Sequence, residues 1–329
     1  MVIYGLGIFH RYDRKGVIMA LIERYLDVTI NKVDIAVERV RLANLSKEPL
    51  YLCYSGGKDS KVVQRICEMA GVPFETHYNL TTVDHPSVVQ EIKADKSIII
   101  DKAHYSDGTP ITMWNLIVKK RMPPTRLQRY CCAELKETNG AGCICVTGVR
   151  KAESVARSLN GGVVKILADK KTKESIINNE LADVEETPKG GLIMNLDNDE
   201  NRRQVEQCYR TNKTLINPII DWTDEDVWEF SKVENIPQSP LYKEMGGAYK
   251  RLGCIGCPMA TVCEKEKEFA DYPKIKQNYI NAFQRLVDGY DKAAQSWVDG
   301  EAVFDWWVYG NGKIKTHADQ ISIESLLDK

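Results

Sequence analysis

The sequence lacks a long apolar segment, a net charge and, near its end, cysteine. No stretch of eighteen or more apolar residues occurs among the 329 residues, so we expect no membrane-spanning helix. The 45 basic and 46 acidic residues leave a net charge of −1. The whole molecule therefore has no general attraction to nucleic acid, although a local basic stripe is compatible with this balance. Residues 264–329 contain no cysteine, so that segment offers no nucleophilic thiol.

The first residues show no export signal. Met1 to Gly16 contain charges after an apolar run that is too short for a secretion signal. Ten cysteines without such a signal are typical of thiols and metal ligands in a reducing compartment, not of a disulfide framework. We therefore expect a cytoplasmic protein.

A glycine-containing loop follows the apolar run Leu50–Tyr54 and precedes a helical pattern that begins near Asp59. Glycines let the backbone approach an anion closely, and the first N–H groups of a helix point outward with the positive end of its dipole. The spacing differs from the Walker pattern, so the sequence predicts another kind of phosphate-binding loop. A simple capped turn is the alternative. The loop consists of Ser55, Gly56, Gly57, Lys58, Asp59 and Ser60.

Two short cysteine pairs lie far apart in the sequence: Cys131 with Cys132, and Cys254 with Cys257. Such pairs can converge on one metal centre, because thiolates select zinc or an iron–sulfur cluster. Adjacent side chains diverge, which suits a cubane cluster better than a single ion. We favour a [4Fe–4S] cluster held by these four cysteines. Structural zinc, buried free thiols and a thioredoxin-like redox pair are the alternatives.

The other cysteines have simpler explanations. Cys263 follows Cys257 closely, so it could be a ligand, a sulfur-handling thiol or a residue without a role. The remaining ones considered lie in apolar patterns and are predicted core residues: Cys53, Cys67, Cys143 and Cys145.

The apolar pattern predicts an α/β fold with a doubly wound, mostly parallel sheet and the ligand at the carboxyl ends of its strands. The predicted strands are Leu50–Tyr54, Phe74–Leu80, Ser97–Asp101 and Cys143–Thr147, and the predicted helices are Asp59–Ala70, Pro86–Ala94 and Thr112–Arg121.

Segments on either side of this core are predicted to be helical. Ile18 to Leu45 and Glu264 to Gln295 have apolar residues near a 3.6-residue spacing. Between the strands, a polar stretch predicts a loop or hairpin insertion. The expected division is an N-terminal helical segment at 1–47, a nucleotide-binding domain at 48–260 with an insertion at about 159–205, and a C-terminal helical extension at 261–329.

Together, the loop, the tandem cysteines and the distal Cys-x-x-Cys resemble the phosphoadenosine phosphosulfate (PAPS) reductase family, and in particular its iron–sulfur, adenylyl-sulfate branch. This family lies within the PP-loop, adenine nucleotide alpha hydrolase superfamily. The segment Gly148–Ser154 with Arg157 resembles the family's arginine segment. Asn217–Thr223 and Asp226–Trp228 resemble its Pro…Trp-Thr…Asp-Val-Trp stretch, and the resemblance extends from about Leu50 to Met259.

The resemblance implies an adenine nucleotide alpha hydrolase-like fold, a [4Fe–4S] cluster, and ATP or adenylyl sulfate as the ligand. Lys58 and Arg150 are the implied catalytic residues, because they can stabilise charge on a leaving pyrophosphate, and Mg²⁺ would share this role. Beyond the loop, the residues expected to bind the nucleotide are Thr81, Thr82, Gly148, Arg150, Glu153, Ser154 and Arg157.

Two departures from the family bear on the reaction. Its reductases carry a nucleophilic cysteine in a C-terminal Glu-Cys-Gly-type motif, whereas no cysteine follows Cys263 here. They also tend to have Leu-Asp-Thr-Gly where this chain has Asn79–Pro86. Relatives with the cluster but without the terminal cysteine include ATP pyrophosphatases that activate a substrate for sulfur insertion.

We therefore expect cleavage of ATP between its α and β phosphates, giving an adenylylated acceptor and pyrophosphate, followed by sulfur transfer. A thioredoxin-dependent reductase that releases sulfite is the first alternative, and a non-catalytic, redox-sensing nucleotide binder is the second. The expected partners are a sulfur donor or reductant protein, a nucleic-acid acceptor and a second copy of the chain.

Overall fold

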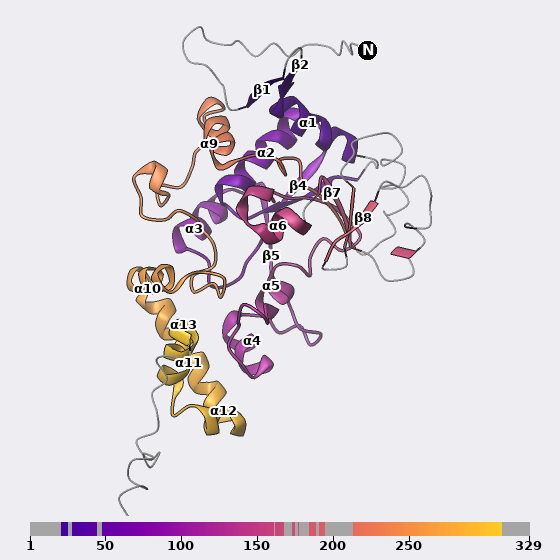
Figure 1. Cartoon of the computed structure of the whole chain (residues 1–329). Coiled ribbons are helices and arrows are strands. Elements are labelled where there is room, and N and C mark those ends of the chain that lie inside the picture. The colour runs from indigo at the N-terminus through magenta and orange to yellow at the C-terminus, as the bar shows by residue number, and fades with distance from the viewer. Residues whose placement is uncertain are drawn as a thin grey trace, which may run out of the picture.

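The core of the molecule is an eight-stranded, mostly parallel sheet (Figure 1). The computed structural model describes residues 21–25, 28–44, 48–160, 162–167, 173–174, 177, 184–188, 191–194 and 213–310. The strands are β3 (Leu50–Tyr54), β4 (Phe74–Asn79), β5 (Ile98–Asp101), β6 (Ile144–Val146), β7 (Val164–Leu167), β8 (Val184–Glu186), β9 (Leu192–Met194) and β10 (Lys213–Ile216). Their order is β5-β4-β3-β6-β10-β7-β9-β8.

The first five strands in this order run parallel, and the other three continue the sheet in antiparallel fashion. The predicted α/β class with a mostly parallel sheet is confirmed, and four of the parallel strands lie within one residue of their predicted ends. The described part of the predicted insertion contributes β7, β8 and β9. The predicted hairpin is present as the antiparallel pair β8–β9, and it extends the main sheet through β7.

Helices cover one face of the sheet: α1 (Lys32–Ala43), α2 (Lys58–Ala70), α3 (Pro86–Ala94) and α9 (Asp224–Val233). Their apolar residues form one core with strand residues such as Leu52, Val146 and Ile216, and α3 packs on Tyr54 and Tyr78. The opposite face is polar near its centre. There the Tyr51 hydroxyl donates to Asp101 over 2.6 Å, and the Tyr51 ring stacks on His77 at 3.9 Å.

The N-terminal segment is only partly helical. Where the pattern predicted helix from Ile18, the structure has an antiparallel hairpin of β1 (Ile22–Tyr25) and β2 (Val28–Asn31) before α1. Four residues with β-branched side chains, Ile22, Val28, Thr29 and Ile30, favour strand over helix here. The Asn31 side chain then caps α1 by accepting from the backbone N–H groups of Val33 and Asp34.

A second core lies in the lower part of Figure 1. It is built by α4 (Met113–Lys120), α5 (Tyr130–Leu135), α10 (Val262–Asp271), α11 (Pro273–Gly289), α12 (Asp291–Ser296) and α13 (Gly300–Tyr309). The segment predicted to be helical from Glu264 to Gln295 is helical, and it divides at Tyr272, before Pro273, and again at Tyr290. Proline lacks the N–H that would continue the helix.

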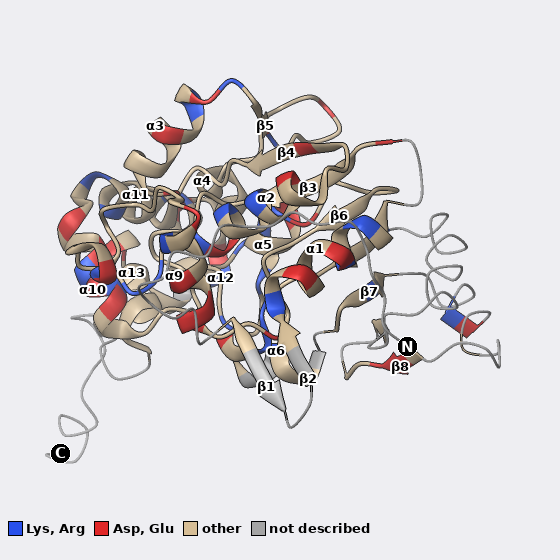
Figure 2. Cartoon of the chain, turned by 90° about the horizontal axis from the view of Figure 1, so that it is seen from above, with Lys and Arg blue, Asp and Glu red and all other residues tan. Residues whose placement is uncertain are grey.

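Three short helices complete the described elements: α6 (Val155–Asn160) and the 3₁₀ helices η1 (Lys151–Glu153) and η2 (Lys243–Met245). Both signs of charge are spread over the helices (Figure 2), in keeping with the net charge of −1. Among the described residues, no helix combines the length and the apolar character that crossing a membrane requires. The cytoplasmic location stays a prediction.

Candidate nucleotide site and cysteine loop

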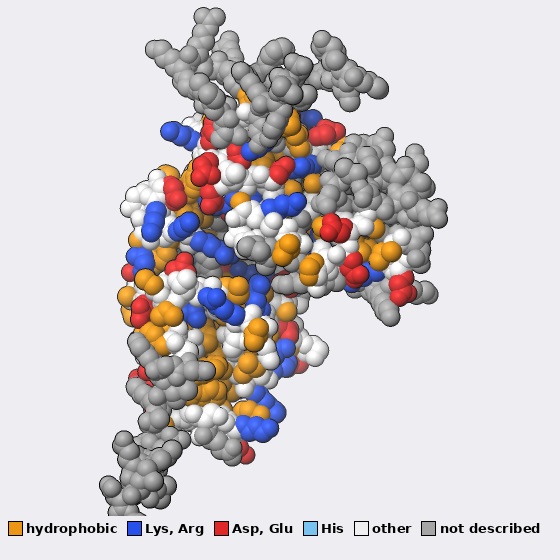
Figure 3. All heavy atoms as spheres, in the orientation of Figure 1, with side chains coloured by type: hydrophobic (Ala, Val, Ile, Leu, Met, Phe, Trp, Pro, Cys, Tyr) orange, Lys and Arg blue, Asp and Glu red, His pale blue; other side chains and the backbone are white. Residues whose placement is uncertain are grey.

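A cavity of about 520 Å³ opens at the carboxyl ends of β3, β4 and β6. This volume lies in the range of small-molecule sites. Lys and Arg side chains surround the hollow near the centre of the face in Figure 3. The basic residues that line it are Lys58, Lys136, Arg150, Arg157, Lys250 and Arg251.

The predicted phosphate loop forms one wall of the cavity. Gly56 has a φ of 71°, and a Cβ at this position would lie 2.6 Å from a Val88 methyl carbon, so only glycine fits. Helix α2 begins at Lys58, whose backbone N–H donates to the Tyr242 hydroxyl over 2.9 Å. The Ser60 hydroxyl donates to the Gly57 carbonyl. The loop is thus held rigidly at a helix N-terminus, where anions are favoured.

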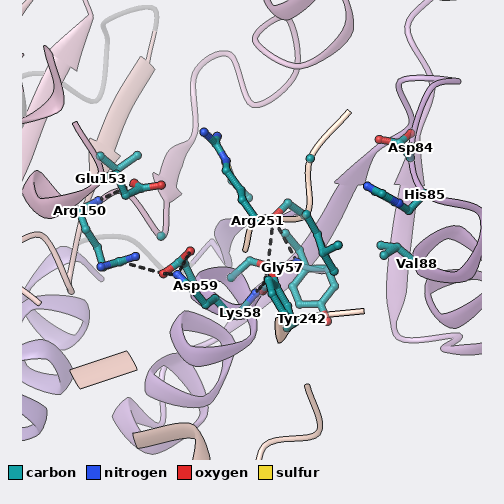
Figure 4. A pocket seen from close by; sticks show the side chains of 18 of the residues that line it. Gly57, Lys58, Asp59, Asp84, His85, Val88, Arg150, Glu153, Tyr242 and Arg251 are labelled. Carbon is teal, nitrogen blue, oxygen red and sulfur yellow. Dashed lines mark hydrogen bonds and ion pairs between the residues drawn. The ribbon is translucent and has the colours of Figure 1, made fainter. Parts of the chain in front are cut away.

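Four charged side chains form a compact network at this end, and Figure 4 shows three of them, Lys58, Asp59 and Arg150. Lys58 Nζ lies 2.9 Å from Asp224 Oδ1 and 3.2 Å from Asp59 Oδ1. Arg150 Nε lies 2.8 Å from Asp59 Oδ1, and its terminal nitrogen lies 2.7 Å from Asp224 Oδ1. Burial alone would raise the pKa of Asp224, but the hydrogen bonds and charges of Lys58 and Arg150 outweigh it and hold that pKa below its usual value.

A second group of cations lies beside this network. Arg157 is ion-paired with Glu153. Burial and the nearby charges of Arg251 and Arg150 nevertheless lower the pKa of Arg157 to about 10. Arginines crowd one another in this way only where an anion can offset their repulsion, so the cavity suits a ligand with several negative charges.

Most of the residues predicted for the nucleotide meet at the cavity. The lining includes Ser55, Gly57, Lys58, Asp59, Ser60, Gly148, Arg150, Glu153 and Arg157. Four others lie outside this lining: Gly56, Thr81, Thr82 and Ser154. Gly56 shapes the loop from behind, and Ser154 is exposed before α6. Thr81 and Thr82 lie in a turn of their own. The Thr82 hydroxyl accepts from the Met113 backbone N–H at the start of α4.

Several lining residues were not predicted, notably Asp84, His85, Asp224, Tyr242 and Arg251. Asp224 follows the Trp222-Thr223 pair and begins α9, where Thr223 provides a capping box with Asp226. An acidic first turn normally serves the helix itself. The sequence therefore did not predict the ion pairs of Asp224 with Lys58 and Arg150, which lie 166 and 74 positions earlier in the chain.

The structure brings three of the four cysteines into the second core. Cys131 is buried on α5, and Cys132 and Cys254 pack against the same cluster. The pKa of Cys131 is raised by a hydrogen bond to Cys132, by burial, and by the charges of Cys132, Cys254 and Cys257. Both members of the distant pair therefore lie close enough to Cys131 to act on its charge.

The Cys-x-x-Cys loop is fixed by its neighbours. Cys254 forms a β-bridge with Asp84, and the Ile255 N–H donates to the Val83 carbonyl over 2.8 Å. Gly256 has a φ of 70°, its N–H donates to Glu268 over 2.7 Å, and a Cβ there would lie 2.7 Å from Phe269 and 2.9 Å from Trp307. The loop therefore packs tightly on α10 and α13, and it joins the cavity through Gly253.

The donor set fits an iron–sulfur cluster. All four cysteines are free thiols. Arg129 lies 3.3 Å from the Cys132 sulfur, and Lys136 lies close enough to Cys254 to raise the pKa of the lysine. These cations can offset the charge of several thiolates. No group of three or more His, Cys, Asp or Glu among the described residues is placed to hold a metal ion, so the cluster and the zinc alternative both stay predictions.

Comparisons with known proteins give the family. A model of the phosphoadenosine phosphosulfate reductase domain matches residues 49–260, well over half of the chain. A phosphoadenosine 5′-phosphosulfate reductase from Xylella fastidiosa is 43% identical over 46 residues, which are 14% of this chain and 18% of that protein. The chain spans about a fifth of the length of the curated relatives it matches.

Two solved structures are also similar. PAPS reductase from Candida auris, in a phosphate complex, is 15% identical with a TM-score of 0.39, over 67% of this chain and 87% of the other. The U34-tRNA thiolase NcsA from Methanococcus maripaludis, with its [4Fe–4S] cluster, is 14% identical with a TM-score of 0.37, over 80% of each chain. With its phosphate loop, arginine segment and matched residues 49–260, this chain belongs to the phosphoadenosine phosphosulfate reductase domain family.

Proposed function

We propose that the chain is an ATP pyrophosphatase that adenylylates an acceptor for sulfur transfer. The single observation that carries this proposal is the charge network at the start of α2, where Lys58 and Arg150 share two carboxylates on the wall of the cavity. Two cations held beside a helix N-terminus form a site for a polyphosphate.

The network gives each residue a role in this reaction. Lys58 and Arg150 would turn from Asp59 and Asp224 to the phosphate oxygens and stabilise the charge that develops on the leaving pyrophosphate. The two carboxylates, released from these ion pairs, would then be free to bind Mg²⁺ through oxygen, which this ion prefers. Arg157 and Arg251 would hold the remaining phosphate charge, since both line the same cavity.

The cysteines would serve the sulfur chemistry. Cys131, Cys132, Cys254 and Cys257 would hold a [4Fe–4S] cluster, which when bound supplies one-electron chemistry. Lys136 lines the cavity and lies beside Cys254, so the cysteine loop and the nucleotide site share a wall. A sulfur donor or reductant protein, a nucleic-acid acceptor and a homo-oligomer remain parts of this proposal.

One observation favours the reductase as a second candidate. Cys263 is exposed at the start of α10, and the next residue, Glu264, lines the cavity. If this helix end moved toward the ligand, the Cys263 thiolate could attack the sulfur of adenylyl sulfate, which would break the bond from sulfur to the phosphate oxygen, release AMP and leave a cysteine S-sulfonate.

The two functions are separated by their products. The anaerobically purified protein should be supplied either with ATP, Mg²⁺ and bulk RNA or DNA as acceptor, or with adenylyl sulfate and thioredoxin. We expect pyrophosphate in the first assay and no enzymatic sulfite in the second. Sulfite release that disappears in Cys263→Ser would overturn this order and establish the reductase.

A further inference from the structure

The cavity has a second end that the phosphate chemistry does not use. In Figure 4, Asp84, His85 and Val88 lie on the opposite side of Lys58 and Arg251 from Arg150 and Glu153. His85 occupies the N-cap position of α3 and is 1% exposed, although it belongs to the cavity lining. Its neighbours in that lining include the apolar and aromatic side chains of Tyr78, Val88 and Leu252.

One ring nitrogen of His85 has no partner among the described residues. The first nitrogen, Nδ1, lies 3.1 Å from the Tyr272 hydroxyl, and Tyr249 and Tyr272 pack edge-on against the ring at 5.1 and 5.2 Å. The second nitrogen, Nε2, is buried and forms no hydrogen bond within the described part of the chain. Buried polar atoms are almost always satisfied, because an unmade hydrogen bond costs about 1–3 kcal/mol. A ligand in the cavity would supply the missing hydrogen bond.

The protonation state of His85 indicates which kind of ligand atom can bind to Nε2. Burial lowers the pKa of His85 to about 4, even though Asp84 and Asp271 act in the opposite direction. The ring is therefore neutral at physiological pH, with one nitrogen as donor and the other as acceptor. A neutral imidazole between hydrophobic walls gives one directional hydrogen bond and little attraction for a phosphate.

We propose that His85 is a specificity-determining residue that hydrogen-bonds the heteroaromatic base of the nucleotide through Nε2, at the end of the cavity remote from Lys58 and Arg150. This inference rests on the proposed function for the presence of a nucleotide and adds the residue that reads its base. Val88 and Leu252 would contact the flat faces of the nucleotide base. Tyr249 and Tyr272 hold the imidazole of His85 in place, so its side chain loses little conformational entropy when the base binds.

The test compares two ligands that differ in the base. Calorimetry should measure the α,β-methylene analogue of ATP, which cannot be cleaved at that bond, and inorganic tripolyphosphate, which has the charge without the base. His85→Phe keeps the ring contacts and removes both nitrogens. We expect its Kd for the analogue to rise about tenfold, as for one lost hydrogen bond. The Kd for tripolyphosphate should stay within twofold.

Two further variants complete the design. His85→Gln, which retains an amide donor and acceptor, should recover part of the lost affinity. His77→Phe, on the polar face of the sheet away from the cavity lining, should bind both ligands as the wild type does. Because His85→Phe removes an unsatisfied buried nitrogen together with the hydrogen bond to Tyr272, its unfolding temperature should stay close to that of the wild type.

The outcomes separate the inference from the proposed function. Equal analogue affinity in wild type and His85→Phe, or an equal loss for both ligands, would overturn the role of His85. If the analogue binds as expected but no acceptor yields pyrophosphate from ATP, the pyrophosphatase proposal fails and the base-reading role of His85 stands.

Discussion

Single residues decide the charge balance of the cavity. Lys58 and Arg150 are each paired with both Asp59 and Asp224, so any phosphate must compete with carboxylates that already occupy the cations. Lys58→Ala should lower pyrophosphate release by about 10²-fold or more, because one charge-stabilising group is lost from the transition state. Lys93→Ala, an exposed lysine on α3, is the matched control. Equal turnover in Lys58→Ala and wild type would remove the loop from the mechanism.

In the absence of divalent metal, the charge of Asp224 should weaken the binding of a phosphate ligand, whereas the charge of Lys58 favours it. Replacing it with Asn keeps the shape but removes the charge that holds Lys58 and Arg150. We expect Asp224→Asn to bind tripolyphosphate several-fold more tightly than wild type when a chelator removes divalent ions. Calorimetry at two salt concentrations would measure this gain, which should shrink at high salt. A weaker Kd under these conditions would mean that Asp224 organises the site rather than competing for it.

For the ion pairs of Lys58 and Arg150 with Asp224, the sequence predicted the two cations and did not predict the carboxylate. Lys58 and Arg150 lie in local patterns, a glycine loop and an arginine segment, that a short stretch of chain displays. Asp224, Tyr242 and His85 became visible only in the fold, because each acts on a residue far away in the sequence. Neither an acidic residue in the first turn of a helix nor a single tyrosine indicates, from its local sequence, a contact with the phosphate loop.

At the scale of elements, the Cys-x-x-Cys loop depends on one glycine. A side chain at Gly256 would enter the space of Phe269 and Trp307, in a backbone conformation that L residues avoid. Gly256→Ala should therefore lower the free energy of unfolding by about 2 kcal/mol or more. It should also reduce iron content after anaerobic reconstitution. Gly289→Ala, at a position with no atom within 4 Å of the added Cβ, should leave both unchanged. Normal stability and iron content in Gly256→Ala would contradict this account.

The cysteine pairs should bind iron as a unit. Anaerobically isolated protein should be brown and contain about four irons per chain, and Cys254→Ser should lose the cluster. Cys143→Ser provides the control, since this half-buried thiol lies beside the sheet and outside the second core. Stoichiometric zinc without iron after reconstitution would refute the cluster and restore the zinc alternative.

The observed bounds of helices and strands agree with those predicted from the sequence where the local signals are strong. The strands β3 to β6 and helices α2 to α4 were predicted closely because apolar periodicity and turns agree there. The hairpin β1–β2 was not, since Ile22 to Ile30 has an apolar spacing that fits a helix while its branched residues favour strand. Strands β7, β8 and β9 carry short, mixed patterns, and they are strands because the sheet edge pairs with them.

At the scale of the whole molecule, a small apolar cluster with Tyr54, Tyr78, Val88 and Leu252 lines the cavity, and there are two larger hydrophobic cores. One lies under the sheet, and the other joins α4 and α5 to the C-terminal helices. Residue 260 ends both the family match and the predicted nucleotide-binding domain, and that boundary stays a prediction. The second core nevertheless crosses it, because α4 packs directly on α11.

A protein that stops at residue 260 should therefore fail to fold properly. It would expose Met113, Leu116 and Ile117, which are at most 2% exposed in the whole chain. We expect aggregation or strong binding of a hydrophobic dye. Co-expression of residues 261–329 as a separate chain should restore soluble protein. A monomeric, cooperatively unfolding 1–260 protein would show that α4 does not depend on these helices.

The packing of Gly256 against Phe269 and Trp307 also sets an order of events in the cell. A ribosome makes Cys131 and Cys132 first and Cys254 and Cys257 much later, and the helices that press the second pair into place come last. Domains fold progressively from the N-terminus during synthesis, so the sheet can form while the thiols are still apart. In the proposed holoprotein, iron insertion would therefore come after these helices have been made, and the machinery that inserts it would meet an already folded nucleotide site.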